Sequence, residues 1–334
     1  MPLHKKNILV TGGAGFIGSH LIEKLVSDAN VICVDDFVSS SERNIDHLLR
    51  LENFNLIRHD ISKPLDLEAY PELDSFKIKF FGVQEIYHLA CPTSVKDFDT
   101  HVMATLFANS VGLINILELA KKYKAKFLQA SSSVIYGARS KQYPFFDENF
   151  RGILDHLTPR GCYDEGKRFA EAAAITYAQA FDLDIKIARI FRTYGPRMKL
   201  YDGQMIPDFI MNALEGHDLV IYGDETFRTS LVYVDDMVDG LIKIMAAPKG
   251  LGPVNLGSDV DLKLVDVAKK IIELTGSTSK IVFQPRLLFM TELGLPNISK
   301  ARDTMGWLPL VRLEDGLKKT VEYTKANRYL LNSV

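Results

Sequence analysis

The sequence has little cysteine, almost no net charge and no long unbroken apolar run. Its 334 residues include only three cysteines, Cys33, Cys91 and Cys162, with no CxxC spacing. This pattern argues against a disulfide framework or a zinc site and favours reduced thiols. The 40 basic and 42 acidic residues leave a formal charge of −2. No general basic field therefore exists to attract nucleic acid or an anionic membrane.

The sequence also lacks the patterns of a membrane protein, a secreted protein and a metalloprotein. No apolar run approaches the roughly 20 residues of a membrane-spanning helix, and the N-terminal segment does not read as a secretory signal. His59, His88 and His101 are spread along the chain without metal-ligand spacing. We therefore expect a cytoplasmic protein without a nucleic-acid, membrane or metal partner.

What is present is an ordinary globular composition. Apolar residues make up 47% and charged residues 25% of the chain, which is the balance of a folded protein with a sizeable core. The length fits one large domain or two modest ones.

Short apolar runs alternate with helical patterns over the first half of the chain. The runs that predict strands are 7–10, 31–34, 55–57, 85–90, 126–130 and 185–191, and helical patterns cover 16–27, 102–122 and 163–181. Strands that alternate with helices indicate βαβ units, and right-handed crossovers place the helices on both faces of a parallel sheet. The predicted fold is α/β, a Rossmann-type doubly wound parallel sheet over residues 1–191.

The regular alternation of predicted strands and helices ends at about residue 192. Proline and glycine become frequent and the elements shorten, with helical patterns near 264–274 and 313–323. This predicts a smaller mixed α/β lobe over residues 192–334, with some chain crossing back to the sheet.

A glycine-rich segment follows the first predicted strand. Gly12, Gly15 and Gly18 open the first helix, and glycine lets a backbone approach a pyrophosphate that faces the helix N-terminus. The next strand ends at Asp35, 17 residues after Gly18, where a carboxylate accepts hydrogen bonds from an adenosine ribose. Asp35 would repel a 2′-phosphate, which favours NAD over NADP. Arg43 lies nearby in sequence and would reverse this preference if it faced that position.

A second motif predicts a base. Tyr163 and Lys167 are four residues apart on a predicted helix and share one face. A phenol with a pKa near 10 must drop by about 3 units, roughly 4 kcal/mol, to act as a base near neutrality, and an adjacent ammonium favours this. Ser132 follows the strand 126–130, at the end where open α/β sheets bind ligands. Its hydroxyl would hydrogen-bond the substrate oxygen that Tyr163 deprotonates.

These motifs resemble the extended short-chain dehydrogenase/reductase family of NAD-dependent epimerases and dehydratases. More narrowly, the chain is similar to the UDP-glucuronate decarboxylases, which make UDP-xylose. The resemblance covers nearly the whole chain, and the run Tyr163-Asp164-Glu165-Gly166-Lys167-Arg168 is its most specific part. The other matching stretches are 11–18, 35–37, 53–60, 87–92, 130–137 and 189–198.

The resemblance implies a reaction at the sugar 4-hydroxyl. Tyr163 would be the base, Lys167 its electrostatic partner and the anchor of the nicotinamide ribose, and Ser132 the hydroxyl partner. Hydride transfer to NAD gives a 4-keto sugar, which in a glucuronate is a β-keto acid that loses carbon dioxide. Hydride return then regenerates NAD, so the cofactor stays bound.

The resemblance also implies the ligand contacts, with residues 192–334 forming most of the nucleotide-sugar site. The residues expected to bind NAD are Gly12, Gly15, Phe16, Ile17, Gly18, Asp35, Asp36, Arg43, Asp60, Ile61, Leu89, Ala90, Tyr163 and Lys167. Those expected to bind the nucleotide sugar, taken as UDP-linked, are Pro92, Asn109, Ser133, Arg192, Arg197 and Arg228.

Several positions depart from the decarboxylase pattern. Val134 stands where those enzymes and the related 4,6-dehydratases usually carry glutamate. Valine exchanges no proton, which disfavours dehydration and weakens the return of a proton to carbon 5 after decarboxylation. The other departures, at positions that usually hold the nucleotide diphosphate, are Arg192, Asp208, Arg228 and Gly294.

Three alternatives to decarboxylation therefore stay open. A 4-epimerase needs only the serine, tyrosine and lysine, NAD, and room for the keto sugar to turn. A 4,6-dehydratase is less favoured, and a non-catalytic NAD-binding regulator would have no use for a base. We predict an NAD-dependent nucleotide-sugar enzyme of the decarboxylase type, with 4-epimerisation as the main rival.

The helix 163–181 also predicts self-association. Small side chains permit close helix approach, and similar enzymes pair two such helices from each subunit in a four-helix bundle. With the helix 102–122 it would build a homodimer. The alanines of this helix are Ala170, Ala172, Ala173, Ala174, Ala178 and Ala180.

Overall fold

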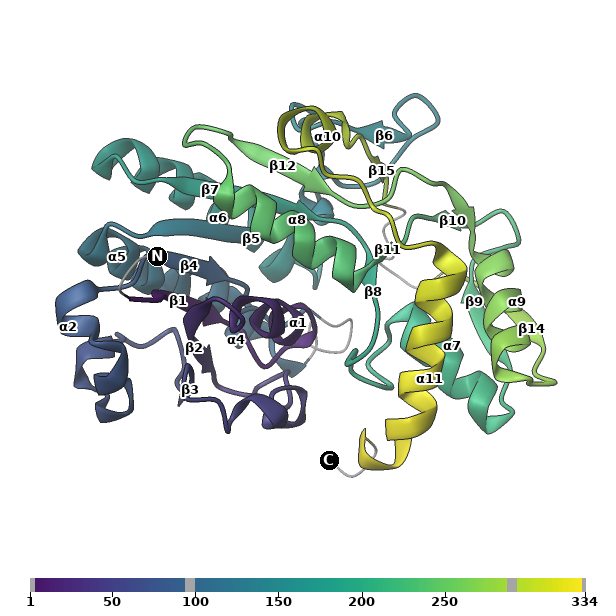
Figure 1. Ribbon diagram of the computed structural model, residues 1–334. Coiled ribbons are helices and arrows are strands. Elements are labelled where there is room, and N and C mark those ends of the chain that lie inside the picture. The colour runs from purple at the N-terminus through teal and green to yellow at the C-terminus, as the bar shows by residue number, and fades with distance from the viewer. Residues whose placement is uncertain (1–3, 94–99, 287–292, 332–334) are drawn as a thin grey trace.

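A parallel sheet forms the centre of the protein in this computed structural model, which describes residues 4–93, 100–286 and 293–331. Its seven strands run in the order β12-β7-β5-β4-β1-β2-β3 (Figure 1). The chain starts in the middle and winds outward in both directions, with the reversal between β1 and β4, so the predicted doubly wound sheet is confirmed. The strands are β1 (Lys6–Thr11), β2 (Ala29–Asp35), β3 (Phe54–Arg58), β4 (Glu85–His88), β5 (Lys126–Ser132), β7 (Ile185–Ile190) and β12 (Pro253–Leu256).

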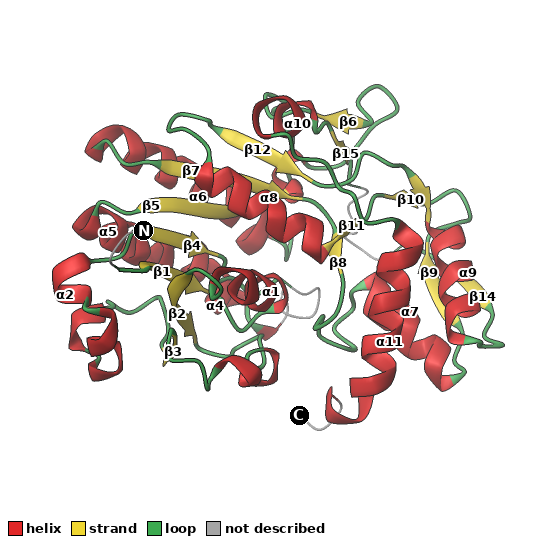
Figure 2. Cartoon of the chain, in the orientation of Figure 1, coloured by secondary structure: helices red, strands yellow, loops and turns green. Residues whose placement is uncertain are grey.

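Both faces of the sheet are covered, which explains the unbroken apolar runs in the sequence. Side chains alternate along a strand, so Ile8 and Val10 of β1 join one core while Leu9 joins the other. The first core lies under α1 (Phe16–Leu25) and α8 (Val234–Ala246). The second lies under α2 (Ile78–Phe81), α5 (Leu113–Tyr123) and α6 (Gly161–Phe181). Figure 2 shows α1 and α8 on the near face of the strands and α5 and α6 on the far face.

The long helix predicted at 102–122 contains an irregular turn. It consists of α4 (Val102–Phe107), one π-helical turn at Ala108–Gly112, and α5. Over Val102–Tyr123 it has the length and mean hydropathy, 1.6, of a membrane-spanning helix, although Asn109, Ser110 and Asn115 interrupt its apolar run. Within the fold, 44% of that window is buried. Its inner side is part of the second core, so packing on the sheet accounts for the apolar composition.

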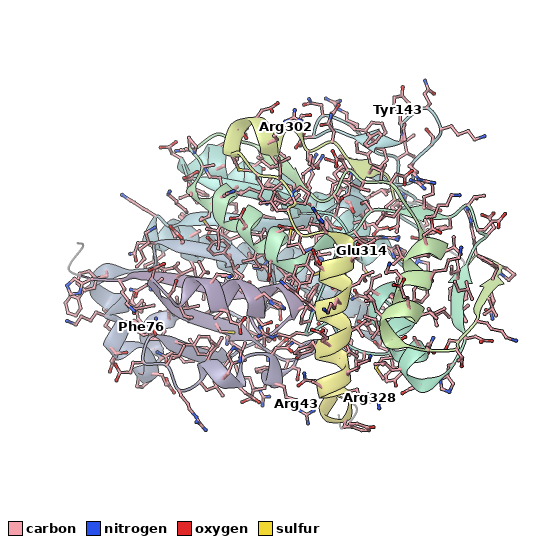
Figure 3. The ribbon with its side chains drawn as sticks, turned by 45° about the vertical axis from the view of Figure 1, so that its right-hand side comes forward. Arg43, Phe76, Tyr143, Arg302, Glu314 and Arg328 are labelled. Carbon is pink, nitrogen blue, oxygen red and sulfur yellow. The ribbon has the colours of Figure 1, made fainter. Side chains whose placement is uncertain are left out.

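Shorter elements follow β7, and two of them return to the sheet. Strand β12 pairs with β7 in parallel register, and α8 packs over β5 and β7. The sequence patterns do not predict β12, α8 or α7. Figure 3 shows α11 along one side, with Glu314 near its first turn and Arg328 near its end. The remaining elements are β6 (Phe145–Phe146), β8 (Thr193–Tyr194), α7 (Met205–Glu215), β9 (Leu219–Tyr222), β10 (Arg228–Thr229), β11 (Val232–Tyr233), β13 (Leu262–Lys263), α9 (Leu264–Thr275), β14 (Ile281–Gln284), β15 (Leu295–Pro296), α10 (Ser299–Met305) and α11 (Leu313–Leu331).

His88 is a buried polar group at the end of β4. Its Nδ1 lies 2.7 Å from the Thr11 hydroxyl of β1. Burial, and then the charge of Lys167, lowers the pKa of His88 from 6.5 to about 3. The unfolded chain takes up a proton on this histidine below pH 6.5, whereas the folded protein resists doing so, so the stabilising difference is lost as the pH falls.

We expect His88 to make the protein acid-sensitive. Between pH 6.5 and 5 this group alone should cost about 2 kcal/mol of the free energy of unfolding. Urea unfolding of the wild type and of His88→Asn at pH 7.5 and pH 5 measures the effect, since other titrations cancel in the comparison. The difference in the free energy of unfolding between the wild type and His88→Asn should be about 2 kcal/mol less favourable to the wild type at pH 5 than at pH 7.5. An equal advantage at both pH values would contradict a neutral His88.

Candidate active site

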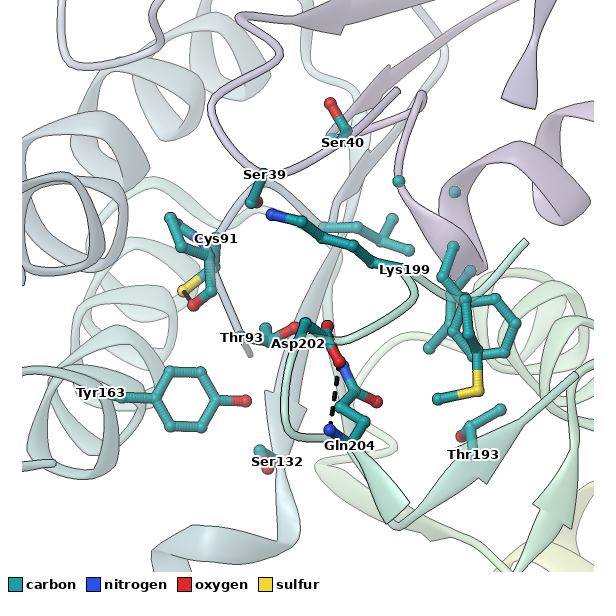
Figure 4. A pocket seen from close by; sticks show the side chains of 18 of the residues that line it. Ser39, Ser40, Cys91, Thr93, Ser132, Tyr163, Thr193, Lys199, Asp202 and Gln204 are labelled. Atoms are coloured by element: carbon teal, nitrogen blue, oxygen red, sulfur yellow. Dashed lines mark hydrogen bonds between the residues drawn. The ribbon is translucent and has the colours of Figure 1, made fainter. Parts of the chain in front are cut away.

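A cavity of about 1720 Å³ opens along the edge where the parallel strands end. It extends from the glycine loop, past the ends of β4 and β5, to the segment 190–209. Open α/β sheets bind ligands at this edge, at the point where the strand order reverses. Figure 4 shows side chains from both halves of the chain entering it.

The glycine loop forms one wall of the cavity. Gly12 has a φ of +70°, and a Cβ there would lie 2.7 Å from the Ala90 backbone. A Cβ on Gly18 would collide with the Gly12 carbonyl oxygen. Helix α1 starts with Gly15 as its N-cap, which has no side chain to cap the first N–H groups. The first turn therefore leaves backbone donors for an anion, as a pyrophosphate site requires.

Asp35 ends β2 and holds the next loop in place. Its carboxylate accepts hydrogen bonds from the backbone N–H groups of Ala14 and Phe37, each at 2.9 Å, and from the Ser40 hydroxyl at 2.6 Å. Burial raises the pKa of Asp35, while these three donors oppose the rise. The neighbouring residues of the predicted NAD set line the same cavity, namely Phe16, Ile17, Asp36, Arg43, Asp60, Ile61, Leu89 and Ala90.

The predicted catalytic side chains meet where α6 packs against the end of β5. Tyr163 and Lys167 are both buried on α6, with exposures of 8% and 4%. The Lys167 ammonium donates to the Ala130 carbonyl at 3.0 Å and lies 5.7 Å from the centre of the Tyr163 ring. The Ser132 hydroxyl lies near the Tyr163 phenol, at the end of β5. Figure 4 shows the phenol oxygen pointing into the cavity beside the strand end.

Burial and charge act in opposite directions on this phenol. Burial, and then the neighbouring Cys91, raises the pKa of Tyr163. The nearby Ser132 hydroxyl and the charge of Arg160 lower it. The sequence assigned the cationic role to Lys167 alone. Arg160, which precedes α6 and lines the cavity, is a second cation that the spacing argument missed.

An apolar wall stands beside Tyr163. Val134 and Tyr163 form a small cluster with Cys91, Cys162 and Leu293. The glutamate expected from the resemblance is therefore replaced by a side chain that packs directly against the tyrosine. At this wall the cavity presents methyl and sulfur groups.

Four of the six predicted substrate residues line the cavity: Pro92, Ser133, Arg192 and Arg197. Arg192 donates to the Thr229 hydroxyl at 3.1 Å. Arg197 pairs with Glu23 of α1 at 2.5 Å, which places it beside the glycine loop.

Asn109 and Arg228 are not among the residues that line the cavity, and their contacts with the substrate stay predictions. Asn109 sits on the π-helical turn and donates to the Thr105 carbonyl at 2.9 Å and the Cys91 sulfur at 3.2 Å. Its side chain fills the space that Gly166 leaves on α6. The Arg228 guanidinium turns toward Asp261, with Nε 2.5 Å from a carboxylate oxygen.

The sequence also missed a loop that enters the cavity between β8 and α7. Residues Lys199 to Gln204 line the cavity, and Figure 4 shows Lys199, Asp202 and Gln204 reaching into it. Left-handed backbone at Tyr201 and Gly203 shapes the turn. The only signal in the sequence was the rising glycine and proline content.

In the described ranges, no group of three or more histidine, cysteine, aspartate or glutamate side chains is arranged to hold a metal ion.

The chain belongs to the NAD-dependent epimerase/dehydratase family, whose family model matches residues 8–257. It is an NAD-dependent enzyme, and the prediction of NAD as its cofactor is confirmed.

Curated relatives and solved structures extend over almost the entire chain. UDP-glucuronic acid decarboxylase 1 of Xenopus tropicalis is 39% identical over 96% of this chain and 72% of its own length. UDP-glucuronic acid decarboxylase 6 of Arabidopsis thaliana is 38% identical over 93% of this chain and 86% of its own. The UDP-glucuronic acid 4-epimerase of Bacillus cereus, solved with UDP-glucuronic acid and NAD, has a TM-score of 0.83 and 28% identity, covering 96% of this chain and 99% of that one.

Asp35 should set the preference for NAD. The variant Asp35→Asn keeps the shape but loses the charge, so NAD affinity should fall about ten- to a hundredfold and the preference over NADP should shrink. Titration with both dinucleotides measures this. Asp46→Asn, at an exposed carboxylate in the same region, is the control and should bind as the wild type does. Unchanged selectivity in Asp35→Asn would assign the ribose contact to another residue.

Proposed function

We propose that this enzyme converts UDP-glucuronate to UDP-xylose by transient oxidation of the sugar 4-hydroxyl. One observation carries the proposal: Ser132, Tyr163 and Lys167 meet in one cavity with the glycine loop, in a chain 37–39% identical to several UDP-glucuronic acid decarboxylases. The substrate and reaction are inferred from those relatives together with this geometry.

The side chains can divide the first step between them. Tyr163 removes the proton of the 4-hydroxyl while the Ser132 hydroxyl holds the same oxygen. The charge of Arg160 favours the phenolate against the desolvation that burial imposes on Tyr163. The Lys167 ammonium, 5.7 Å from the centre of the Tyr163 ring, would act in the same direction. The glycine loop and Asp35 would hold NAD, which would supply the acceptor for the carbon 4 hydride and the means to return it. The resulting 4-keto sugar is a β-keto acid, so the C5–C6 bond breaks, carbon dioxide leaves, and its electron pair moves toward the ketone.

A 4-epimerase is the second candidate, and Val134 favours it. Decarboxylation must be followed by proton delivery to carbon 5, and the apolar wall around Val134 offers no acid. Epimerisation requires no such proton, only rotation of the keto sugar before hydride return. The structural similarity to the Bacillus cereus UDP-glucuronic acid 4-epimerase is consistent with this outcome. A dehydratase would need a base at the Val134 position, and a regulator would need no Ser132–Tyr163–Lys167 set.

Incubation with UDP-glucuronate should release carbon dioxide and yield UDP-xylose. The variant Tyr163→Phe should retain bound NAD but lose turnover by several orders of magnitude, because the base is gone. Carbon dioxide detection with NMR of the sugar product measures both. Formation of the 4-epimer with the carboxylate retained would establish the epimerase instead. Turnover by Tyr163→Phe at the wild-type rate would rule out Tyr163 as the base.

We further propose a homodimer formed through the outer surface of α4, α5 and α6. Large apolar side chains on these helices are exposed, including Met103 at 54%, Val111 at 49% and Phe169 at 49%. Exposed apolar surface shared by neighbouring helices is typical of a protein interface.

Light scattering should give a mass of twice the 37.5 kDa chain. Val111→Glu should shift the protein to monomer, because it buries a charge in the interface. Phe80→Glu is the matched control, since Phe80 is 85% exposed on α2 and should leave the dimer intact. A monomeric wild type would contradict the proposal.

A further inference from the structure

Helix α6 is fastened to the end of β5 at two adjacent points. Lys167 donates to the Ala130 carbonyl at 3.0 Å, and one helical turn further on Glu171 accepts from the Ser131 hydroxyl at 2.6 Å. The next residue of the strand is Ser132, whose hydroxyl lies near the Tyr163 phenol. Tyr163, Lys167 and Glu171 thus form one stripe that faces the strand end.

Arg189 of β7 fixes the Glu171 carboxylate from the other side. Its Nε and Nη2 contact the two carboxylate oxygens at 3.0 and 2.8 Å. The two side chains are only 10% and 12% exposed. With the Ser131 hydroxyl, these contacts give both oxygens a donor, which is what a nearly buried carboxylate requires.

Arg189 also contacts Tyr136, at the far end of the segment 131–136 that contains Ser132. Arg189 Nη1 donates to the Tyr136 hydroxyl at 2.8 Å and to the Glu148 carbonyl at 2.8 Å. Tyr136 in turn donates to the Asn255 side chain of β12 at 2.7 Å. Segment 131–136 is therefore held at Ser131 and at Tyr136, with Ser132, Ser133 and Val134 between them.

A nearly buried ion pair is weak support for stability, because apolar side chains of similar volume often stabilise as well. The bidentate geometry of the Glu171–Arg189 pair does fix the orientation and separation of the two side chains. Through them it holds segment 131–136 against α6, the helix that carries Tyr163 and Lys167. A misplacement of about 1 Å in such a set can cost a hundredfold in rate.

We propose that Glu171 and Arg189, acting through Ser131, are positioning residues that set the Ser132 hydroxyl against the Tyr163 phenol. Neither side chain touches the cavity, so neither is a catalytic residue. The proposal rests on the proposed function for its rate measurements, because those need a sugar that the enzyme oxidises.

The test compares Ser131→Ala and Glu171→Gln with the wild type. Ser131→Ala removes only the link to the strand and keeps the ion pair, so it is the mild variant. Thr320→Val is the control, since it deletes a buried hydroxyl on α11 that donates to the Gly316 carbonyl. Turnover of UDP-glucuronate, NAD affinity and thermal midpoint are measured for each protein.

Positioning predicts a split between kcat and binding. In Ser131→Ala and Glu171→Gln, kcat should fall about ten- to a hundredfold, while KM and NAD affinity stay within about twofold. Thr320→Val should keep wild-type kcat at a similar thermal midpoint to Ser131→Ala. Unchanged kcat in Ser131→Ala, or a fall matched by an equal loss of NAD affinity, would overturn the proposal.

A second readout does not depend on turnover. The ring carbon of Tyr163, labelled with ¹³C and assigned by its absence in Tyr163→Phe, reports the surroundings of the phenol by NMR at neutral pH. If Ser131→Ala displaces Ser132, the phenol loses its neighbouring hydroxyl, so this resonance should shift, whereas Thr320→Val should leave it in place. An unmoved resonance in Ser131→Ala would contradict positioning. A wild type inactive on UDP-glucuronate would instead refute only the proposed function.

Discussion

The packing of α6 against the carboxyl end of β5 is the contact on which the site depends. It places the phenol of Tyr163 beside the Ser132 hydroxyl and directs Lys167 to the Ala130 carbonyl. The parallel sheet makes this possible, because its strands all end at one edge, where the glycine loop also lies. The glycine loop and Tyr163 therefore line one cavity, although more than 140 residues separate Gly18 from Tyr163 in the sequence.

Three of the positions that depart from the decarboxylase pattern have local packing or hydrogen-bonding partners. Val134 lies against Tyr163, and the space beside Gly294 is filled by the buried ring of Phe146. Arg192 bonds Thr229 instead of standing free. The departures thus lie at predicted substrate positions, whereas the predicted residues Ser132, Tyr163 and Lys167 are all present at the end of β5. Such a division fits one redox reaction adapted to a particular sugar.

Features with a local signal could be predicted from the sequence. The glycine spacing, the strand ending at Asp35 and the Tyr163–Lys167 pair each occupy a short stretch, and their structural context follows from alternating strands and helices. Contacts between distant segments gave no such signal. The Glu171–Arg189 pair, the identity of β12 as the strand that crosses back to the sheet, and the loop at Asp202 depend on tertiary packing. Asn109 and Arg228 were assigned by resemblance, yet local partners, Cys91 and Asp261, hold their side chains elsewhere.

The central claim is that the hydrogen on carbon 4 leaves as hydride and returns to the same carbon. UDP-glucuronate carrying deuterium at carbon 4 tests this for decarboxylation and epimerisation alike. The account predicts that the product keeps the deuterium at carbon 4, since the cofactor that takes the label stays bound and gives it back. A product with ordinary hydrogen at carbon 4, formed at the same rate, would contradict it.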